Sequence, residues 1–398
     1  MSRFKDSKIF FIFLKKILVL LQPWFKKDTY ILFDNLYEKN AECIDTYCIF
    51  EYMQQHNIKS YYVVWRENPF YEKLKKEQKL KNVIVIKHSI YERTCFEFFR
   101  KIWLHLFRTK AVITSFGGIN WEIVEFLYKN KYITYMCSDH GSVFFKTFVL
   151  ESGYFGKNIY NKFLVCNEYE SDLFQQYGWD KDNLEIIGLP RWDLLRKEHN
   201  KQKTIFVMFT WRTSFYSGNR DKFTTPIESS KYVTRILSFF NNEKLHKLLK
   251  KYNVKIQAAL HHSMLDQTGG QFNFKCDNVE IVPSVNISDY IGKADLFITD
   301  YSSLFFDFAF LNTPIVFYRP DFDDTTLIEL DRADMEHVKS LDDRVYNVCY
   351  DENSVLDCIE KYMKNGFILE DENKIKNDKL FYTKENIRQK FVDYLGKI

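Results

Sequence analysis

The 398-residue sequence lacks the glycine-rich signatures of the common nucleotide-binding sites. It contains neither Gly-x-Gly-x-x-Gly nor the phosphate loop Gly-x-x-x-x-Gly-Lys-Ser/Thr. It also lacks an excess of charge of one sign, because 57 Lys and Arg residues stand against 53 Asp and Glu residues and leave a net charge of +4. The sequence therefore indicates neither a standard dinucleotide site nor a P-loop, and its charge does not require a nucleic acid partner.

No two of the eight cysteines have the Cys-x-x-Cys spacing of metal and redox motifs. They lie scattered through segments expected to be strands and helices, which is typical of buried free thiols. The apolar N-terminus is not followed by a small-residue cleavage site of the kind that ends a signal peptide. Both observations fit a protein that stays in a reducing cytoplasm.

No stretch near the N-terminus combines the length and the apolar character of a membrane-spanning helix. Residues 9–25 are strongly apolar, but the pair Lys15–Lys16 interrupts them and the pair Lys26–Lys27 follows. A spanning helix needs about 20 residues with few charges, whereas basic residues and aromatic anchors are typical of a helix in the membrane surface. We therefore expect residues 1–27 to form an amphipathic helix that holds the protein peripherally on the cytoplasmic face of the cell membrane. A core helix of the first domain is the alternative.

Short apolar runs rich in strand-forming residues alternate with helical stretches along the rest of the chain. This alternation predicts α/β architecture with parallel sheets covered by helices on both faces, and the length favours two domains. We expect Rossmann-like domains over residues 28–199 and 200–372, followed by a C-terminal helix within 373–398 that packs back on the first domain. Residues 232–252 are expected to be helical.

The stretch from 294 to 318, ADLFITDYSSLFFDFAFLNTPIVFY, is the clearest supersecondary unit of the chain. Its spacing predicts a strand over 296–299, a helix over 304–311 and a second strand over 315–318. In such a unit ligands sit at the carboxyl end of the strand, beside the helix start. Ser302 and Ser303 stand there, and hydroxyls with backbone N–H groups suit phosphate. The alternative is that both serines only cap the helix.

The same stretch resembles the CDP-glycerol glycerophosphotransferase family. The residues that carry the resemblance are Asp-x-x-Ile-Thr-Asp-Tyr-Ser-Ser-x-x-Phe-Asp, which ends at Asp307, and the following Pro-Ile-x-Phe-Tyr. Three further segments are similar to the family: His-Gly-x-x-x-x-Lys at 140–146, Gly-x-Pro-Arg-x-Asp at 188–193 and Thr-Trp-Arg at 210–212. The resemblance implies the GT-B fold, in which the two domains face a central cleft, and enzymes that build teichoic acids or capsules.

The resemblance also implies roles for particular residues. His140 is the expected general base, although Ser142, Val143 and Phe144 stand where the family has Thr-Pro-Leu after His-Gly. His261 aligns with a family histidine, and His262 replaces the proline that follows it. The expected catalytic residues are His140 and His261, and the expected substrate-binding residues are Gly141, Lys146, Arg191, Asp193, Arg212, Asp300, Ser302, Ser303 and Asp307.

Physical readings of these residues leave two questions open. Arg191 presents a fork-shaped donor suited to phosphate, or it and Asp193 pair with each other or with a helix end. The neighbours His261 and His262 resemble a metal site, but no carboxylate or cysteine cluster accompanies them. We therefore expect no metal and no other cofactor.

Together these features predict a transferase that moves a polyol phosphate, with glycerol phosphate expected, from a CDP-activated donor. The acceptor is expected to be a hydroxyl of a lipid-linked or polymeric glycan, and CMP leaves. A GT-B glycosyltransferase that uses a nucleotide sugar is the first alternative, because a fold alone does not fix the donor. A non-catalytic, membrane-associated binding protein is the second, since the Arg-Gly-Phe-Tyr segment of the family has no match after Tyr318.

Overall fold

A computed structural model of the chain divides into two compact units. Unit 1 comprises Met1–His140, Gly153–Asp193 and Tyr382–Ile398, and unit 2 comprises Gly141–Ser152 and Leu194–Phe381. The structure describes residues 16–17, 20–21, 24–34, 45–86, 102, 105–115, 129, 131–138, 141–145, 147, 150, 160–198, 200–210, 231–260, 274, 276–283, 287–322 and 335–398.

Unit 1 is built on a seven-stranded parallel sheet with the strand order β3-β2-β1-β4-β5-β6-β7. The central strands are buried along nearly their whole length, which is why the sequence shows them as continuous apolar runs. The strands are β1 (Thr29–Phe33), β2 (Ser60–Trp65), β3 (Val83–Ile86), β4 (Thr109–Thr114), β5 (Thr134–Cys137), β6 (Lys162–Val165) and β7 (Leu184–Ile186).

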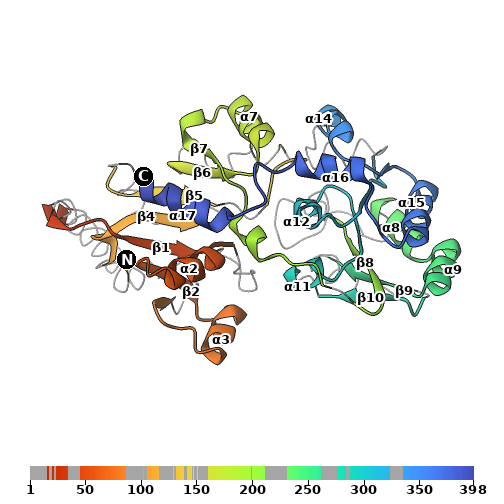
Figure 1. Cartoon of the computed structure of the whole chain (residues 1–398), viewed down its shortest axis with the longest axis horizontal. Helices are drawn as coiled ribbons and strands as arrows, with labels where there is room; N and C mark the ends of the chain where they lie inside the picture. Colours follow the sequence, from red (N-terminus) through yellow and green to blue (C-terminus); the bar gives the residue numbers. More distant parts are fainter. Residues whose placement is uncertain are drawn as a thin grey trace, which may run out of the picture. The chain divides into compact units, whose positions relative to one another are not determined.

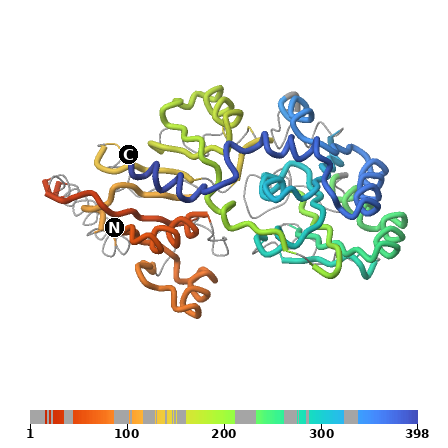
Figure 2. The backbone as a smooth tube through the Cα atoms, in the orientation of Figure 1, coloured from red at the N-terminus to blue at the C-terminus, as the bar shows by residue number. Residues whose placement is uncertain are grey.

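Two helices of unit 1 begin at asparagine caps. Asn68 accepts a hydrogen bond from the Phe70 N–H at the start of α3, and Asn167 accepts one from the Glu170 N–H at the start of α7. The last helix, α17, packs on α2 within this unit although it follows unit 2 in the chain (Figures 1 and 2). The helical elements are α2 (Asp45–Gln55), α3 (Pro69–Lys76), α7 (Glu168–Gln176), α17 (Ile387–Lys397) and the 3-10 turns η2 (Lys181–Asn183) and η3 (Pro190–Leu194).

Unit 2 is built on a six-stranded parallel sheet with the order β10-β9-β8-β11-β12-β13. Its strands are β8 (Lys203–Met208), β9 (Val254–Ala259), β10 (Val279–Val282), β11 (Leu296–Thr299), β12 (Ile315–Tyr318) and β13 (Val348–Cys349). Its helical elements are α8 (Lys231–Phe240), α9 (Glu243–Tyr252), α11 (Ser288–Ile291), α12 (Phe305–Phe310), α14 (Met335–Ser340), η6 (Asp342–Arg344), α15 (Glu352–Lys364) and α16 (Asp371–Asp378).

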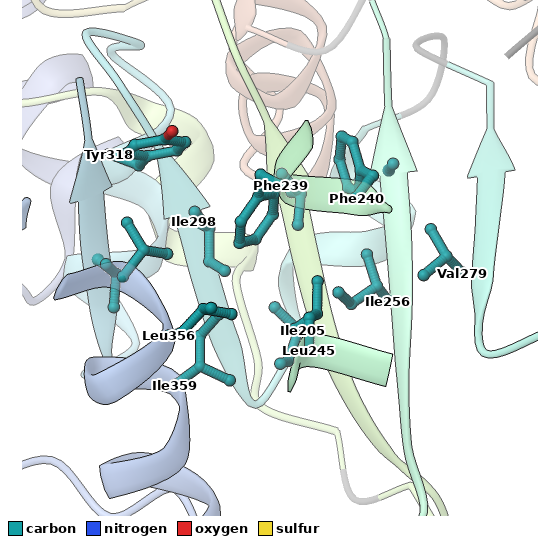
Figure 3. Packing of buried hydrophobic residues seen from close by; sticks show 14 of the residues in the cluster. Ile205, Phe239, Phe240, Leu245, Ile256, Val279, Ile298, Tyr318, Leu356 and Ile359 are labelled. Atoms are coloured by element: carbon teal, nitrogen blue, oxygen red, sulfur yellow. The ribbon is translucent and has the colours of Figure 1, made fainter. Parts of the chain in front are cut away.

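Alternating side chains of the second sheet supply two apolar layers. Ile205, Ile256 and Ile298 project into a cluster with residues of α8, α9 and α15, among them Phe239 and Leu356 (Figure 3). The intervening side chains pack differently. The ring of Phe297 stacks on that of Phe308 in α12 with centroids 4.0 Å apart, and Phe206 stacks on both. Through Phe308, these ring contacts pack α12 against β8 and β11.

The predicted α/β class with two parallel sheets is confirmed. The unit predicted over 294–318 is present as β11, α12 and β12, and α12 is one residue shorter at each end than predicted. The stretch predicted to be helical over 232–252 is helical over most of its length, but it forms two helices, α8 and α9. The chain breaks between α8 and α9 because the Asn242 side chain accepts hydrogen bonds from the N–H groups of Lys244 and Leu245 and starts a second helix.

The amphipathic helix predicted for residues 1–27 lies mostly outside the described residues. In the part of the chain that the structure describes, no helix has the length and apolar character needed to cross a membrane.

Candidate functional site

The polar turn after β11 lies at the carboxyl edge of the second sheet, next to the end of β8. The connections from β8 lead outward to β9 and β10, and β11 begins the other half of the sheet. The strand order therefore reverses between β8 and β11, and ligands of open α/β sheets bind at such a point. The residues that leave the two strands here are Thr210 on one side and Asp300 to Ser303 on the other.

Asp300 joins the ends of these two strands. Its side chain is fully buried, and Oδ1 accepts hydrogen bonds from the N–H groups of Thr210 at 2.8 Å and Tyr301 at 2.6 Å. The Tyr232 hydroxyl lies 3.2 Å from Oδ2. A carboxylate used in this way fixes the backbone around the site. Asp300 therefore positions the start of the segment that continues into Trp211 and Arg212.

The two serines of the turn have different surroundings. The Ser302 side chain is nearly buried, and its Oγ accepts a 3.3 Å hydrogen bond from the Leu304 N–H. Ser303 is partly exposed, and its hydroxyl has no hydrogen-bond partner in the described part of the chain. Neither serine is the N-cap of α12, because that position belongs to Leu304, which makes no side-chain cap. The arrangement leaves the Ser303 hydroxyl available to a ligand.

Gly141 of the His-Gly motif lies against Ser303 within unit 2. A Cβ atom built on Gly141 would stand 2.6 Å from Ser303 Oγ and 3.2 Å from Ser303 Cβ. Any residue other than glycine would therefore displace the serine side chain. Two motifs that are about 160 residues apart in the sequence thus meet at one point of the site.

The residues that follow Gly141 are anchored by aromatic contacts in the same unit. Phe144 and Phe145 are buried, and their rings pack against Phe305 with centroids 5.4 Å away in both cases. Arg319, directly after β12, lies with its guanidinium carbon 5.1 Å from the centroid of the Phe145 ring. Arg319 is not among the residues predicted from the sequence. Its place immediately after a strand, like that of Asp300, is the signal that could have found it.

Arg191 and Asp193 make structural contacts in unit 1. Arg191 forms an ion pair with Asp45 at the first residue of α2, and both side chains are 11% exposed. Asp193 accepts hydrogen bonds from the N–H groups of Ile387 at 3.0 Å and Arg388 at 2.7 Å, at the start of α17. These contacts match the helix-end alternative that the sequence left open. Whether either residue also binds substrate stays a prediction.

The remaining predicted site residues divide into one buried carboxylate and four residues without described positions. Asp307 is fully buried on α12. His140, Lys146, Arg212 and His261 lie outside the described residues. Among the residues that are described, no group of three or more His, Cys, Asp or Glu side chains is arranged to hold a metal ion.

A buried carboxylate also stands at the carboxyl edge of the first sheet. Asp34 follows β1, is fully buried, and accepts hydrogen bonds from the Thr46 N–H at 2.8 Å and the Tyr62 hydroxyl at 2.9 Å. Burial raises the pKa of Asp34 above its usual range, and these hydrogen bonds offset only part of that shift. Asp34 ties β1 to the start of α2, which carries the Asp45 partner of Arg191.

Three comparisons relate the chain to known proteins. The chain is 27% identical over 374 residues to the minor teichoic acid biosynthesis protein GgaB of Bacillus subtilis (strain 168), a match that covers 89% of this chain and 38% of that protein. The chain spans less than half of the length of the first curated relatives it matches. Solved structures of similar fold include the wall teichoic acid polymerase TagF, with a TM-score of 0.62, 18% identity, and coverage of 100% of this chain and 96% of that chain.

The fold is shared more widely than one activity. A putative UDP-N-acetylglucosamine 2-epimerase from Listeria monocytogenes superimposes with a TM-score of 0.57 and 10% identity, over 94% of this chain and 96% of that chain. Because proteins with another described activity share this fold, the family of the chain is assigned from its sequence. The family model described as CDP-Glycerol:Poly(glycerophosphate) glycerophosphotransferase matches residues 15–395, nearly the whole chain. The chain belongs to the CDP-glycerol:poly(glycerophosphate) glycerophosphotransferase family.

Proposed function

We propose that the protein transfers glycerol phosphate from CDP-glycerol to a hydroxyl of a lipid-linked or polymeric glycan acceptor, in the synthesis of a teichoic acid-like or capsule polymer. Family membership supports the reaction class. The observation that carries the proposal is the contact of Gly141 with Ser303, because it brings the motif of the expected base to the motif of the expected phosphate ligand.

The reaction is a phosphoryl transfer. The acceptor hydroxyl attacks the β-phosphorus of CDP-glycerol, the bond from that phosphorus to the bridging oxygen breaks, and CMP leaves with the electron pair. In the proposal His140, the residue before Gly141, takes the acceptor proton, which a neutral imidazole can do near pH 7. Such reactions depend mainly on positioning and on stabilisation of charge.

The donor diphosphate is assigned to the residues after β8, β9 and β11. Ser303 offers an unengaged hydroxyl, and Ser302 stands beside it. Arg212 and His261 would supply positive charge or hydrogen bonds to the phosphate oxygens. Asp300 acts through placement, since it holds Thr210 two residues before Arg212. Asp307 and Lys146 complete the proposed donor side, and Arg191 is a weaker candidate because Asp45 already engages it.

We also propose that the N-terminal stretch binds the membrane surface near the acceptor. Among the described residues of this stretch, Leu20 is 70% and Trp24 83% exposed, and Lys16 and Lys26 are exposed beside them. Apolar and basic side chains exposed together are typical of an interfacial segment. The unchanged protein should sediment together with vesicles that contain anionic lipid. The double variant Leu20→Ser/Trp24→Ser should stay in the supernatant. Equal pelleting of both proteins would remove this part of the proposal.

The reaction is tested by release of CMP from CDP-glycerol in the presence of a lipid-linked glycan acceptor, with CDP-ribitol and a panel of nucleotide sugars in parallel. His140→Ala should lower turnover by about 10²- to 10⁴-fold, the usual contribution of a general base. Ser303→Ala should reduce the increase in the melting temperature of the protein that CDP-glycerol causes in a thermal shift assay. Ser238→Ala, an exposed serine on α8, is the matched control and should behave as the unchanged protein. Release of a nucleoside diphosphate from a nucleotide sugar, or full activity of folded His140→Ala, would contradict the proposal.

A further inference from the structure

Arg319 occupies an unusual place for a charged side chain. It follows β12 directly and is 0% exposed. Its Nη1 forms an ion pair with Asp342 Oδ1 at 2.5 Å, whereas Nε and Nη2 have no hydrogen-bond partner among the residues that the structure describes. A buried guanidinium is costly unless its surroundings stabilise the charge. Its remaining neighbours therefore decide why it is there.

Two of those neighbours are aromatic rings from different segments of unit 2, and the Tyr350 hydroxyl, which donates to Asp342, is a third. The guanidinium carbon lies 5.1 Å from the centroid of the Phe145 ring and 5.2 Å from that of Tyr301. Cation–π contacts of this kind are strongest when water is excluded. Phe145 belongs to the segment that begins at Gly141, and Tyr301 belongs to the turn that contains Ser303. One cation is thus shared by the two segments that meet at the site.

Further contacts hold the segment that begins at Gly141 against other elements of unit 2. The Phe144 ring packs edge-on against Phe306 at 5.5 Å, and the Phe144 carbonyl oxygen lies 2.9 Å from Nε2 of His337 in α14. Phe145 packs edge-on against Phe317, which lies on β12 two residues before Arg319. These contacts hold Phe144 and Phe145 in place. The ring of Phe145 also meets that of Tyr301 edge-on, with centroids 6.3 Å apart, and Arg319 contacts both of these rings.

We infer that Arg319 is a positioning residue that keeps Gly141 in contact with Ser303 by holding Phe145 and Tyr301 together. The inference rests on the proposed function for its catalytic consequence, because the Gly141–Ser303 contact lies where the donor phosphate would bind. The planar guanidinium is required, since it contacts both rings while it pairs with Asp342. The ammonium group of a lysine could keep the ion pair but not the stacking.

The test compares Arg319→Met and Arg319→Lys with the unchanged protein by hydrogen exchange and by CMP release. Amides in peptides that cover 141–145 and 300–303 should exchange about 10- to 30-fold faster in Arg319→Met, the factor that corresponds to loss of a desolvated cation–π contact. The kcat should fall by about 10²-fold, as a misplaced site does, with a much smaller change in the KM for CDP-glycerol. In Arg319→Lys, the increase in exchange and the fall in kcat should both be smaller than in Arg319→Met.

Lys361→Met is the matched control. Lys361 also lies over a ring, 5.6 Å from the centroid of Tyr362, and pairs with Glu370 at 2.5 Å, but its side chain is 53% exposed on α15. It should change neither exchange at the two segments nor kcat. If Arg319→Met does not fold, Phe145→Leu removes the same cation–π contact while keeping an apolar side chain, and it should give the same exchange pattern.

Unchanged exchange at both segments in a folded Arg319→Met protein would overturn the inference, whether or not kcat falls. Exchange is measured without substrate and so does not depend on the reaction. If the unchanged protein releases no CMP from CDP-glycerol while Arg319→Met still loosens both segments, the proposed function fails and the positioning role stands.

Discussion

Gly141 approaches Ser303 so closely that a methyl group on Gly141 would lie 2.6 Å from the serine hydroxyl oxygen. Non-bonded carbon and oxygen atoms do not approach to this distance, so the serine must turn away or the chain must shift. The glycine of the His-Gly motif is thus required by its neighbour in the Asp-Tyr-Ser-Ser turn. This relationship gives the first prediction.

Gly141→Ala should lower CMP release by about 10- to 100-fold while the protein remains folded, because the displaced group is the proposed phosphate ligand. The measurement is steady-state CMP release together with a melting temperature. Gly396→Ala is the control, since a Cβ at that position of α17 meets nothing within 4 Å. It should leave activity unchanged and leave stability equal or slightly higher.

The double variant Gly141→Ala/Ser303→Ala separates a local clash from a general defect. Without the hydroxyl, the closest remaining atom to the new methyl group is the side-chain carbon of residue 303, which lies 3.2 Å away. The double variant should therefore be about as active as Ser303→Ala alone. Losses that simply multiply would show that Gly141→Ala acts elsewhere.

The sheets were predictable from sequence because parallel strands are buried on both faces. The runs at 204–209 and 296–299 are strands for that reason, and β11 has the predicted bounds. The break between α8 and α9 was not predicted, because helical spacing continues through it. It depends on the Asn242 side chain, whose capping hydrogen bonds outweigh the pattern.

The parts of the site that the sequence could not show depend on contacts between distant segments. The motifs indicated Gly141 and Ser303 separately, and nothing in the spacing places one on the other. Arg319 is followed by Pro320 and Asp321 in a stretch that looks like an ordinary acidic loop. Its contacts with Phe145 and Tyr301 become visible only in the structure, where β12 brings it beside both rings.

The ion pair of Arg191 with Asp45 gives a second prediction, on stability. Both side chains are 11% exposed, so removal of one partner leaves a buried charge. Asp45→Asn and Arg191→Met should each lower the free energy of unfolding by about 3 kcal/mol, measured from urea unfolding curves. Asp357→Asn is the control. Its partner Lys244 lies 2.7 Å away, but the side chains are 69% and 46% exposed, and the loss should be below about 1 kcal/mol.

The same variants distinguish a structural role of Arg191 from donor binding. A structural ion pair predicts that Asp45→Asn and Arg191→Met have similar effects and that the KM for CDP-glycerol changes little in protein that is still folded. A large rise in that KM with Arg191→Met alone, at unchanged stability, would show instead that the guanidinium contacts the donor.

The third prediction concerns the pH dependence of stability and rests on Asp34. Burial raises the pKa of Asp34 in the folded protein. The folded state therefore binds more protons than the unfolded state at pH values between about 4 and the raised pKa. The contribution of Asp34 to the free energy of unfolding is therefore fully present below that window and is lost as the pH rises through it. Asn has no such titration and so provides the reference.

Urea unfolding of the unchanged protein and of each variant should be compared from about pH 2 to pH 8. The free energy of unfolding of the unchanged protein, relative to Asp34→Asn, should fall as the pH rises and then level off once Asp34 is ionised in both states. Asp351→Asn tests the sign. Asp351 is exposed and accepts a hydrogen bond from the Ser354 N–H at the start of α15, and hydrogen bonds from Ser354 lower its pKa. Its contribution should instead be lost as the pH falls below about 4. A difference for Asp34→Asn that is flat or rises with pH would mean that its carboxylate is ionised without penalty, and that the hydrogen bonds from Thr46 and Tyr62 fully offset its burial.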